Sequence, residues 1–146
     1  MSTIRCDIVT VERQVYSDEV DMVVAPGIMG TLGILPKHAP LITALEEGEL
    51  RLKKGEEEES FAVSGGYMEV RPDRVIIMAG TAEQADEIDE ARAEAARQRA
   101  EQFLKEKPPD MDRAAIEGAL RRSRVRLKVA RKRRRRRTLP QERIQE

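Results

Sequence analysis

Alternating apolar and polar residues dominate the first eighty positions of the chain. Residues 4–8, 20–24 and 50–52 each alternate with a period of two, which is the pattern of a strand with one buried face. Turn signals separate such runs at regular intervals, among them Gly55 and the RPDR segment at 71–74. Short strands with regular turns predict an all-β sandwich or barrel up to about residue 80.

The hydrophobic period changes after residue 80, where alanine becomes frequent. Residues 86–105 place apolar side chains every three to four positions, which predicts an amphipathic helix. The proline pair at 108–109 ends this helix, and Asp110 or Asp112 can cap a second one. The expected buried stripes are Ile88, Ala91, Ala95, Ala100 and Phe103 or Leu104 on the first helix, and Ile116, Ala119, Leu120, Leu127 and Ala130 on the second.

Two helices joined by a short break form a helical hairpin, which we expect over residues 85–137. Alanine lets two helix backbones approach closely but buries little area, so at about 25 cal/mol per Å² the hairpin is weakly held. An element that is held weakly can leave its docking site, which is a prerequisite for a switch. The expected fold class is therefore α+β in two parts. An antiparallel β-sandwich over residues 1–84 is followed by the hairpin and a basic tail.

Charge is unevenly distributed, although the formal net charge is zero. Residues 1–80 carry 8 basic and 14 acidic residues, a net −6, and residues 81–146 carry 19 and 13, a net +6. Residues 121–137 hold 12 basic side chains and no acid, so the last seven are too self-repelling to stay helical without an acidic partner. The acidic run at 56–59 is expected to be a solvated hairpin tip, and residues 138–146 a disordered tail.

The composition argues against several classes of function. Cys6, the one cysteine, cannot form an internal disulfide and is expected to be a small core residue. His38, the one histidine, has no second histidine at ligand spacing, so neither a catalytic triad nor a metal site is expected. No apolar run approaches the roughly 20 residues that span a bilayer, and the N-terminus is not that of a signal peptide. We expect a soluble, cytosolic, non-enzymatic protein that can still dock on a membrane assembly.

Charged residues on the two predicted helices form a candidate ligand site. Asp89 and Arg92 are three residues apart and Arg99 follows Arg92 by seven, so they share one helix face. Arg122 and Arg126 share a face of the second helix. If these faces meet, one carboxylate lies near several guanidiniums, which suits a nucleotide. The guanidiniums can bind its phosphate oxygens, and the carboxylate can accept from an amino or hydroxyl group. Ordinary surface ion pairs, each worth about 0.2–0.5 kcal/mol, explain the same spacings.

Four segments occur in a specific order: GTLGILPKHAPL at 30–41, SGGYMEV at 64–70, RVIIMAG at 74–80 and IDEARA at 88–93. Together they resemble the epsilon subunit of the bacterial rotary ATP synthase, over about residues 3–130. The resemblance implies a β-sandwich that links the gamma subunit to the c-subunit ring as part of the rotor. It also implies a hairpin that either folds on the sandwich or extends along gamma into the alpha and beta subunits, where it inhibits ATP hydrolysis. Such a subunit is non-catalytic and peripheral, at the cytoplasmic face of the cell membrane, with no membrane span of its own.

The resemblance also implies a regulatory ATP site, with no cofactor and no metal. Some bacterial members bind ATP between the folded helices, without hydrolysing it, through an [IL]DxxRA motif. The residues of this chain that match the motif are Ile88, Asp89, Arg92 and Ala93. The residues that stand where those members carry further ligands are Glu83, Arg99, Arg122 and Arg126.

Rotor contacts and an inhibitory arm follow from the same resemblance. Thr31, where some relatives carry a glutamate that faces the c ring, and His38 are the predicted rotor contacts. The predicted inhibitory arm, which acts on an acidic partner in the catalytic head, consists of Arg121, Arg122, Arg124, Arg126 and Lys128. The basic run at 131–137 and the tail beyond it exceed the usual length of the family.

Two other functions stay open on the residues alone. The basic segment at 121–137 is the electrostatic footprint of a nucleic-acid-binding protein, although it holds no aromatic side chain that could stack on a base. A free-standing nucleotide-sensing module would use the same helix arginines without any partner subunit.

Overall fold

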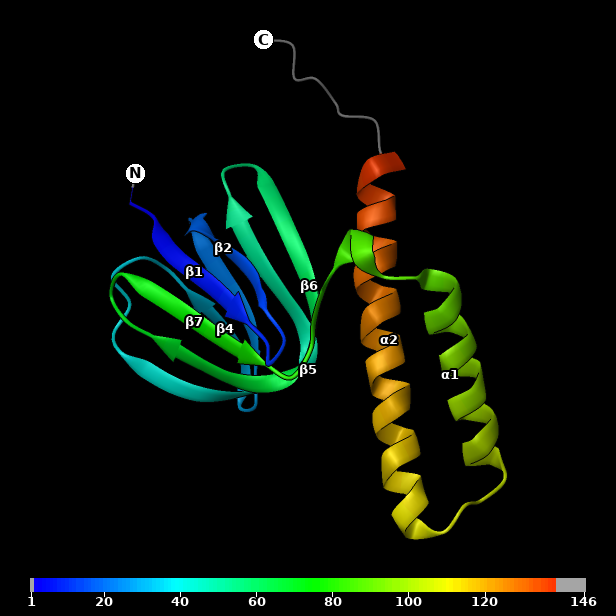
Figure 1. Cartoon of the computed structure of the whole chain (residues 1–146). Helices are drawn as coiled ribbons and strands as arrows, with labels where there is room; N and C mark the ends of the chain where they lie inside the picture. Colours follow the sequence, from blue (N-terminus) through cyan, green and yellow to red (C-terminus); the bar gives the residue numbers. More distant parts are fainter. Residues whose placement is uncertain (1, 139–146) are drawn as a thin grey trace.

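The computed structural model describes residues 2–138, which form a β-sandwich followed by a two-helix hairpin (Figure 1). The strands are β1 (Ile4–Val9), β2 (Gln14–Val20), β3 (Met22–Gly27), β4 (Gly30–Ile34), β5 (Leu41–Lys54), β6 (Glu57–Val70), β7 (Arg74–Ala79) and β8 (Ala82–Gln84). The helical elements are the 3₁₀ turn η1 (Ala85–Glu87), α1 (Glu90–Lys105) and α2 (Asp110–Thr138). The predicted two-part fold is confirmed, while its division at residue 84 stays a prediction.

One hydrogen-bonded sheet builds the sandwich, with the strand order β2-β1-β7-β6-β5-β3-β4 and with β8 paired to β6. The prediction of antiparallel pairing is wrong for β1 and β7, which run parallel. The other strand pairs are antiparallel. A parallel pair arises here because the chain passes through β2 to β6 between these two strands instead of turning back in a hairpin. The sheet folds over itself, so that the ring of Tyr16 in β2 lies 5.6 Å from that of Phe61 in β6.

An aliphatic core fills the space between the two layers. Ile4, Cys6 and Ile8 on β1 are fully buried, as their alternation predicts, and so are Leu50 and Leu52 on β5. Burial raises the pKa of the Cys6 thiol to about 12, with a smaller contribution from the neighbouring Asp7 carboxylate. Cys6 therefore stays protonated and serves as a small core residue, as predicted.

The alternation at 20–24 is not one strand, which corrects the prediction for this segment. The Asp21 carboxylate accepts a 2.6 Å hydrogen bond from the Gly55 amide and so turns the chain away between β2 and β3. Beyond this break the side chain of Val23 is fully buried, whereas that of Met22 is half-buried.

The acidic run at 56–59 is a solvated tip only in its first half, Glu56 and Glu57, which is a second correction. Glu56 lies in the turn, but the three following glutamates belong to β6, whose pairing with β5 continues to Glu57 opposite Lys54. The side chain of Glu58 is only 13% exposed, because α2 packs over this part of the strand. The run therefore contributes carboxylates to a helix contact.

The first long helix, α1, begins four residues later than predicted. Ile88 and Asp89 have extended backbone angles, with ψ of 123° and 99°, which separate η1 from α1. The Asp89 carboxylate then accepts a 3.1 Å hydrogen bond from the Arg92 amide and caps the new helix. Asp89, which the motif suggested as a nucleotide ligand, is thus also the N-cap of α1.

Burial on α1 follows the expected stripe only in part. Ala100 is buried as predicted, whereas Ala91, Ala95 and Phe103 are exposed. Ala93, which was outside the predicted stripe, is buried. The predicted stripe was phased on Ile88, which lies before α1 and packs with a separate cluster. On α2, the prediction is confirmed for the buried Leu120, Leu127 and Ala130, while Ile116 and Ala119 are half-buried.

The second helix, α2, continues without interruption to Thr138, so the basic residues 131–137 are helical. From the sequence, this run is expected to be helical only beside an acidic partner. Carboxylates of the same chain provide that partner for Arg131, Lys132 and Arg133. Thr138 belongs to this helix and not to a disordered tail. The rest of the predicted tail, 139–146, lies outside the described residues.

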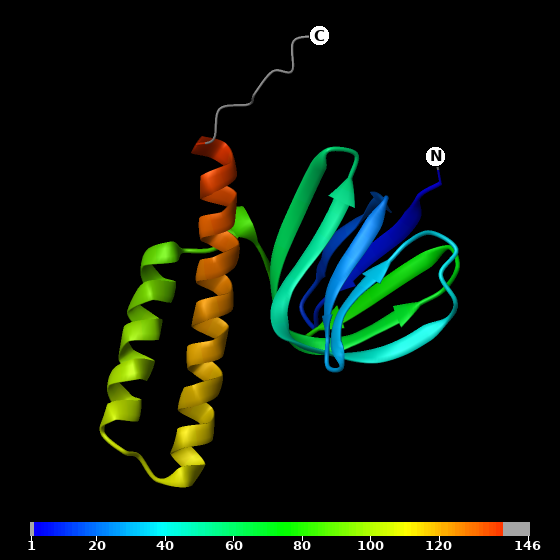
Figure 2. The ribbon, with the colours of Figure 1, turned by 180° about the vertical axis from the view of Figure 1, so that it is seen from behind.

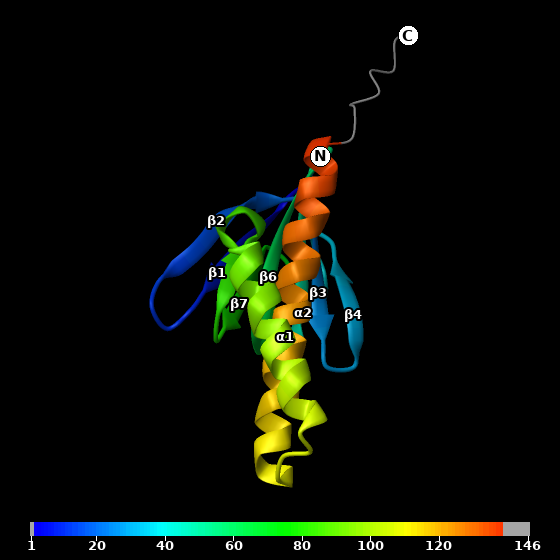
Figure 3. The same cartoon turned by 90° about the vertical axis from the view of Figure 1, so that its right-hand side faces the viewer.

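The hairpin docks on the sandwich through α2, which lies between the strands and α1 in both opposite views (Figures 1 and 2). The side view shows the hairpin in front of the sheet, with α1 nearest the viewer and α2 behind it (Figure 3). One small apolar cluster joins hairpin and sandwich: Ala62, Ala85, Ile88, Val129 and Ala130, with Val125 packed against it. Because these side chains are mostly small, polar contacts carry much of the docking.

Candidate functional site

A pocket of about 400 Å³ lies where the hairpin meets the sandwich, between α1, α2 and the edge formed by β6 and β8. This volume is within the range of small-molecule sites. Alanine and serine side chains contribute much of the wall, while the charged residues of the wall are Glu83, Arg122 and Arg126. The pocket therefore contains three of the eight predicted nucleotide ligands.

Both pocket arginines already face carboxylates. Arg126 donates two hydrogen bonds, from Nε and Nη2, to one oxygen of Glu83 at 3.1 and 3.0 Å. Arg122 donates from Nη1 to Glu47 of β5 at 3.4 Å. A phosphate group bound in the pocket would compete with these carboxylates for the same guanidinium donors.

Arg92 and Arg99 of α1 are not part of the pocket wall. Ala96 of α1 is part of the pocket wall, and the two arginines lie four residues before it and three after it. Residues at these spacings share one face of a helix. Both arginines are exposed. Of the four predicted arginines, Arg122 and Arg126 therefore line the cavity, while Arg92 and Arg99 lie on α1 outside its wall.

The remaining motif residues have structural positions outside the pocket wall. Ile88 packs in the small cluster with Val129 and Ala130, and Ala93 is fully buried in the helix hairpin. Asp89 caps α1, as described above. The motif thus has a local structural explanation that is independent of any ligand.

Four residues of the predicted inhibitory arm pair with carboxylates of the same chain. Besides the contacts of Arg122 and Arg126, Arg121 lies 3.8 Å from Glu47 and Arg124 lies 3.7 Å from Glu101. Lys128 is exposed on the same helix. In the folded hairpin, the arm therefore faces its own sandwich and α1.

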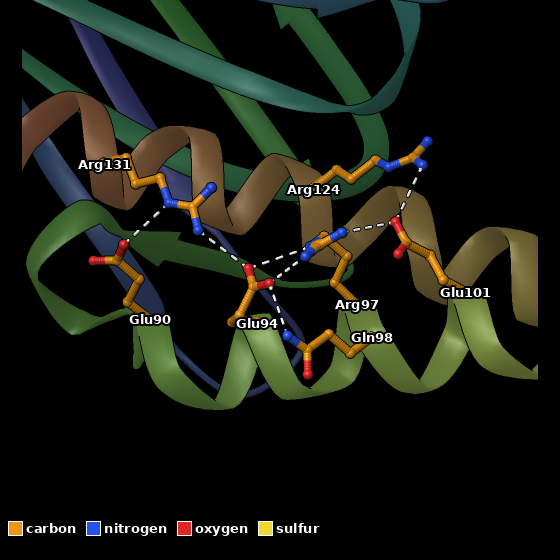
Figure 4. A network of polar contacts seen from close by, with 7 residues as sticks. All are labelled: Glu90, Glu94, Arg97, Gln98, Glu101, Arg124 and Arg131. Atoms are coloured by element: carbon orange, nitrogen blue, oxygen red, sulfur yellow. Dashed lines mark hydrogen bonds and ion pairs between the residues drawn. The ribbon is translucent and has the colours of Figure 1, made fainter.

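A charged network connects the two helices of the hairpin (Figure 4). Arg97 of α1 bonds to Glu94 and, at 2.7 Å, to Glu101 on either side of it. These carboxylates also contact α2, where Arg131 donates to Glu94 at 3.1 Å and Arg124 lies near Glu101. The hydrogen bond from Arg97 lowers the pKa of Glu94, so this carboxylate stays ionised at neutral pH.

Some site residues carried no signal in the sequence. Glu47 is 75 positions before Arg122, and no local spacing connects a strand residue to a helix so far away. Ser64, Thr81 and Ser123 add hydroxyl groups to the pocket wall, and Ser123 also donates to the Ala119 carbonyl at 2.9 Å.

The predicted rotor contacts lie on the sandwich. Thr31 is exposed on β4, next to the β3–β4 turn, where Met29 is 95% exposed. His38 is half-buried in the bend after β4, with Nδ1 2.7 Å from the carbonyl oxygen of Ala39. The tip beside Thr31 is therefore apolar and uncharged.

An apolar patch covers the outer face of β5, β6 and β7. Its members are Ile42, Tyr67 and Met78, which are 73%, 59% and 43% exposed. Tyr67 pairs with Met78 on β7 and with Ala44 on β5, and Ile42 lies two residues before Ala44 on the same face. Exposed patches of this kind mark protein interfaces.

Within the described residues, no group of three or more histidine, cysteine or acidic side chains is placed to hold a metal ion. None of the helices in that part of the chain is both long and apolar enough to cross a bilayer.

Two family models match the chain along most of its length. Residues 3–85 match the β-sandwich domain of the ATP synthase delta/epsilon chain, and residues 86–131 match the long α-helix domain of the same chain. Together with the observed fold, these matches define a β-sandwich and helical-hairpin protein of the ATP synthase delta/epsilon type.

The chain belongs to the family of bacterial ATP synthase epsilon chains. It is 58% identical to the ATP synthase epsilon chain of Dehalococcoides mccartyi over 135 residues, which cover 92% of this chain and 96% of the relative. The epsilon chain of Herpetosiphon aurantiacus is 55% identical over 133 residues, which cover 91% and 98%. As an epsilon chain, the protein is a non-catalytic subunit of ATP synthase, as predicted from the resemblance.

Solved structures share the fold at low sequence identity. A chain in the cryo-EM structure of the Euglena gracilis mitochondrial ATP synthase has a TM-score of 0.76 and 22% identity, covering 88% of this chain and 81% of that one. A chain in the Tetrahymena thermophila central stalk and c-ring structure has a TM-score of 0.53 and 18% identity, covering 90% and 96%. The family match favours the epsilon-chain function over a nucleic-acid-binding protein or a free-standing sensor.

Proposed function

We propose that the chain is the central-stalk subunit that links gamma to the c-subunit ring, and that its hairpin inhibits ATP hydrolysis when it leaves the sandwich. The observation that carries the regulatory part is that Arg122 and Arg126 belong to two groups at once. They line the pocket, and they are members of the inhibitory arm. One pair of arginines cannot serve a nucleotide and an external acidic partner together, so occupation of the pocket opposes inhibition.

Docking on the rotor uses the sandwich in this proposal. The patch of Ile42, Tyr67 and Met78 offers an apolar face to gamma, and the uncharged tip around Met29 and Thr31 meets the c ring. His38 lies in the bend after β4 as a further rotor contact. The subunit is then peripheral to the membrane, at its cytoplasmic face, and it reaches the alpha and beta subunits through the hairpin.

Charges placed in the apolar patch are expected to weaken binding to gamma. The double substitution Ile42→Asp and Tyr67→Asp should weaken it by roughly thirtyfold, because truncated or charged anchor residues cost about 2 kcal/mol or more. The matched control, Ile42→Val with Tyr67→Phe, keeps the apolar surface and should bind normally. Titration of the labelled full-length variants with gamma measures the affinity of each. Equal affinities for the two variants would show that gamma binds elsewhere.

ATP binds the pocket of the folded hairpin in this proposal and is not hydrolysed there. Arg122 and Arg126 line the cavity, and Arg92 and Arg99 stand on α1 at helical spacing from the wall residue Ala96. A guanidinium group can bind two phosphate oxygens at once. Glu83 stands among these donors as a predicted further ligand. A ligand that prefers the folded state stabilises it by about 2.7 kcal/mol at a hundredfold excess over Kd.

Calorimetric titration of ATP into the full-length chain tests this site. Arg126→Ala removes a phosphate donor and should raise Kd about 5- to 150-fold, which corresponds to about 1–3 kcal/mol. Arg113→Ala is the matched control, because Arg113 lies on the same helix and pairs with Glu117 away from the pocket. An unchanged Kd in the Arg126 variant, or equal losses in both variants, would dismiss the site.

A further inference from the structure

The last part of α2 that the structure describes in full lies against carboxylates of the sandwich. Nζ of Lys132 is 3.1 Å from Oε1 of Glu49 on β5 and 3.5 Å from Oε1 of Glu58 on β6. The side chains of these glutamates are only 8% and 13% exposed. Arg51 also lies near both, 3.8 Å from Glu49 and 4.0 Å from Glu58. Because both carboxylates are largely withdrawn from water, the loss of the closer lysine would still weaken their compensation.

The neighbouring basic residues extend the contact to two other elements. Arg131 donates from Nε to Glu90 and from Nη2 to Glu94, both at 3.1 Å, which ties α2 to the first turns of α1. Nη2 of Arg133 lies 3.7 Å from Oδ2 of Asp86 in η1. Three consecutive basic side chains therefore engage three separate parts of the fold.

Apolar contact near this charge cluster is small. Val129 and Ala130 are buried directly before it, and they pack with Ala62, Ala85 and Ile88. These side chains bury little area, so the ion pairs around residues 131–133 are a large share of what holds this end of α2 to the sandwich.

We propose that residues 131–133 form an electrostatic clasp that holds the hairpin closed, a role distinct from that of the inhibitory arm at 121–128. The helix-domain family model ends at residue 131, so Lys132 and Arg133 follow the matched region. The clasp opposes the extended state, so its loss favours opening and, where the proposed function holds, stronger inhibition. The arm and the clasp thus have opposite effects on the enzyme, although both are basic.

Distance measurements on the isolated full-length chain test the clasp without any other subunit. Spin labels are attached at Asp73→Cys, in the exposed turn between β6 and β7, and at Lys105→Cys, at the exposed end of α1. The native Cys6 is fully buried and stays unlabelled. Pulsed electron-spin measurements then report the ratio of open to closed hairpins.

Lys132→Gln is expected to raise the open-to-closed ratio about tenfold, because it removes a close cation from two largely buried carboxylates. Lys128→Gln removes the same charge from an exposed position of the same helix and should leave the ratio unchanged. Salt should open the wild-type chain more than the Lys132 variant, since the clasp is the screened contact. An unchanged distance distribution in Lys132→Gln, or equal opening in both variants, would overturn the clasp.

A charge exchange separates the ion pair from a general effect on helix stability. Lys132→Glu should open the hairpin, and adding Glu58→Lys to it should restore part of the closed population. Failure of the second substitution to close the hairpin would show that the pair does not carry the contact. These measurements contain neither ATP nor gamma. A failure of the proposed inhibition would therefore appear only in assays of the assembled enzyme and would leave the distances unaffected.

Discussion

Replacing Gly66 by alanine is expected to destabilise the protein by about 4 kcal/mol or more, a large part of the roughly 5–15 kcal/mol by which an ordinary domain is stable. Gly66 lies within β6, between Leu45 of β5 and Ala79 of β7. Its φ is +135°, and an added Cβ would lie 2.0 Å from the carbonyl oxygen of Met78. Because the clashing atom is backbone of the adjacent strand, no side-chain rotation can relieve it.

The matched control is Gly30→Ala at the start of β4. Gly30 has a similar φ of +126°, but no atom lies within 4 Å of an added Cβ. It therefore measures the backbone conformation alone, for which we expect a loss of about 1 kcal/mol. Urea unfolding of both variants gives the comparison. Similar midpoints for the two would show that the β6–β7 contact at Gly66 can relax without cost.

The strands could be predicted because their burial has a period that is local to each segment. Ile4, Cys6 and Ile8 alternate within one strand, and each is fully buried. The break at Asp21 was missed because its cause is a hydrogen bond to Gly55, 34 residues away. A local pattern carries no information on such a contact, and the alternation of apolar and polar residues continues past Asp21 in the sequence.

The start of α1 was missed for a different reason. Asp86 and Glu87 are suited to a first helical turn, yet they form η1, and the chain becomes extended at Ile88. Ile88 turns toward Val129 of α2 instead of joining the α1 stripe. Tertiary packing here overrides the helical period, so the phase of the expected stripe was wrong while the existence of the helix was right.

The candidate site could be predicted in part. Arginines at helical spacing on two helices point to a shared face, and the pocket does contain Arg122 and Arg126. The family resemblance also indicated Glu83, which lies in the pocket and accepts from Arg126. Glu47, the strand partner of Arg122, could not be linked to α2 from one sequence. The roles of all these residues toward ATP or the rotor stay predictions.

Removing the end of α2 is expected to release the assembled enzyme from inhibition. A chain that ends at Leu120 lacks residues 121–146 and with them every basic residue of the arm. If the arm opposes rotation in the direction of hydrolysis, the ATPase rate should rise roughly fivefold or more, as expected for couplings of about 1–3 kcal/mol. The measurement is the ATPase rate of enzyme reconstituted with the full-length chain or with the truncated chain, at the same ATP concentration. A rate as low as that with the full-length chain would place inhibition outside the arm.

A full-length variant separates the charge of the arm from the length of the helix. Arg121→Gln, Arg124→Gln and Lys128→Gln neutralise three arm residues that do not line the pocket, so the ATP site keeps Arg122 and Arg126. Their present partners are weak contacts: Arg121 and Arg124 lie 3.8 and 3.7 Å from carboxylates, and both are largely exposed. The folded hairpin should therefore survive the change, while attraction to an acidic partner in the head is reduced. We expect this variant to recover most of the rate of the truncated chain, and more so at low salt, where exposed charges act over longer distances.

Because of the clasp, the direction in which Lys132→Gln changes the ATPase rate is informative. Lys132→Gln removes a basic residue from the same helix. It should nevertheless lower the ATPase rate below that with the unsubstituted chain, because more hairpins open and place an intact arm in the head. Basic residues at 121–128 and at 132 are then distinguished by opposite effects on one measured rate. If Lys132→Gln instead raises the rate as the arm variant does, the distal basic residues act on the same partner as the arm. The ATPase rates of the truncated chain, the arm variant and the Lys132 variant, measured at one salt concentration, decide between these two arrangements.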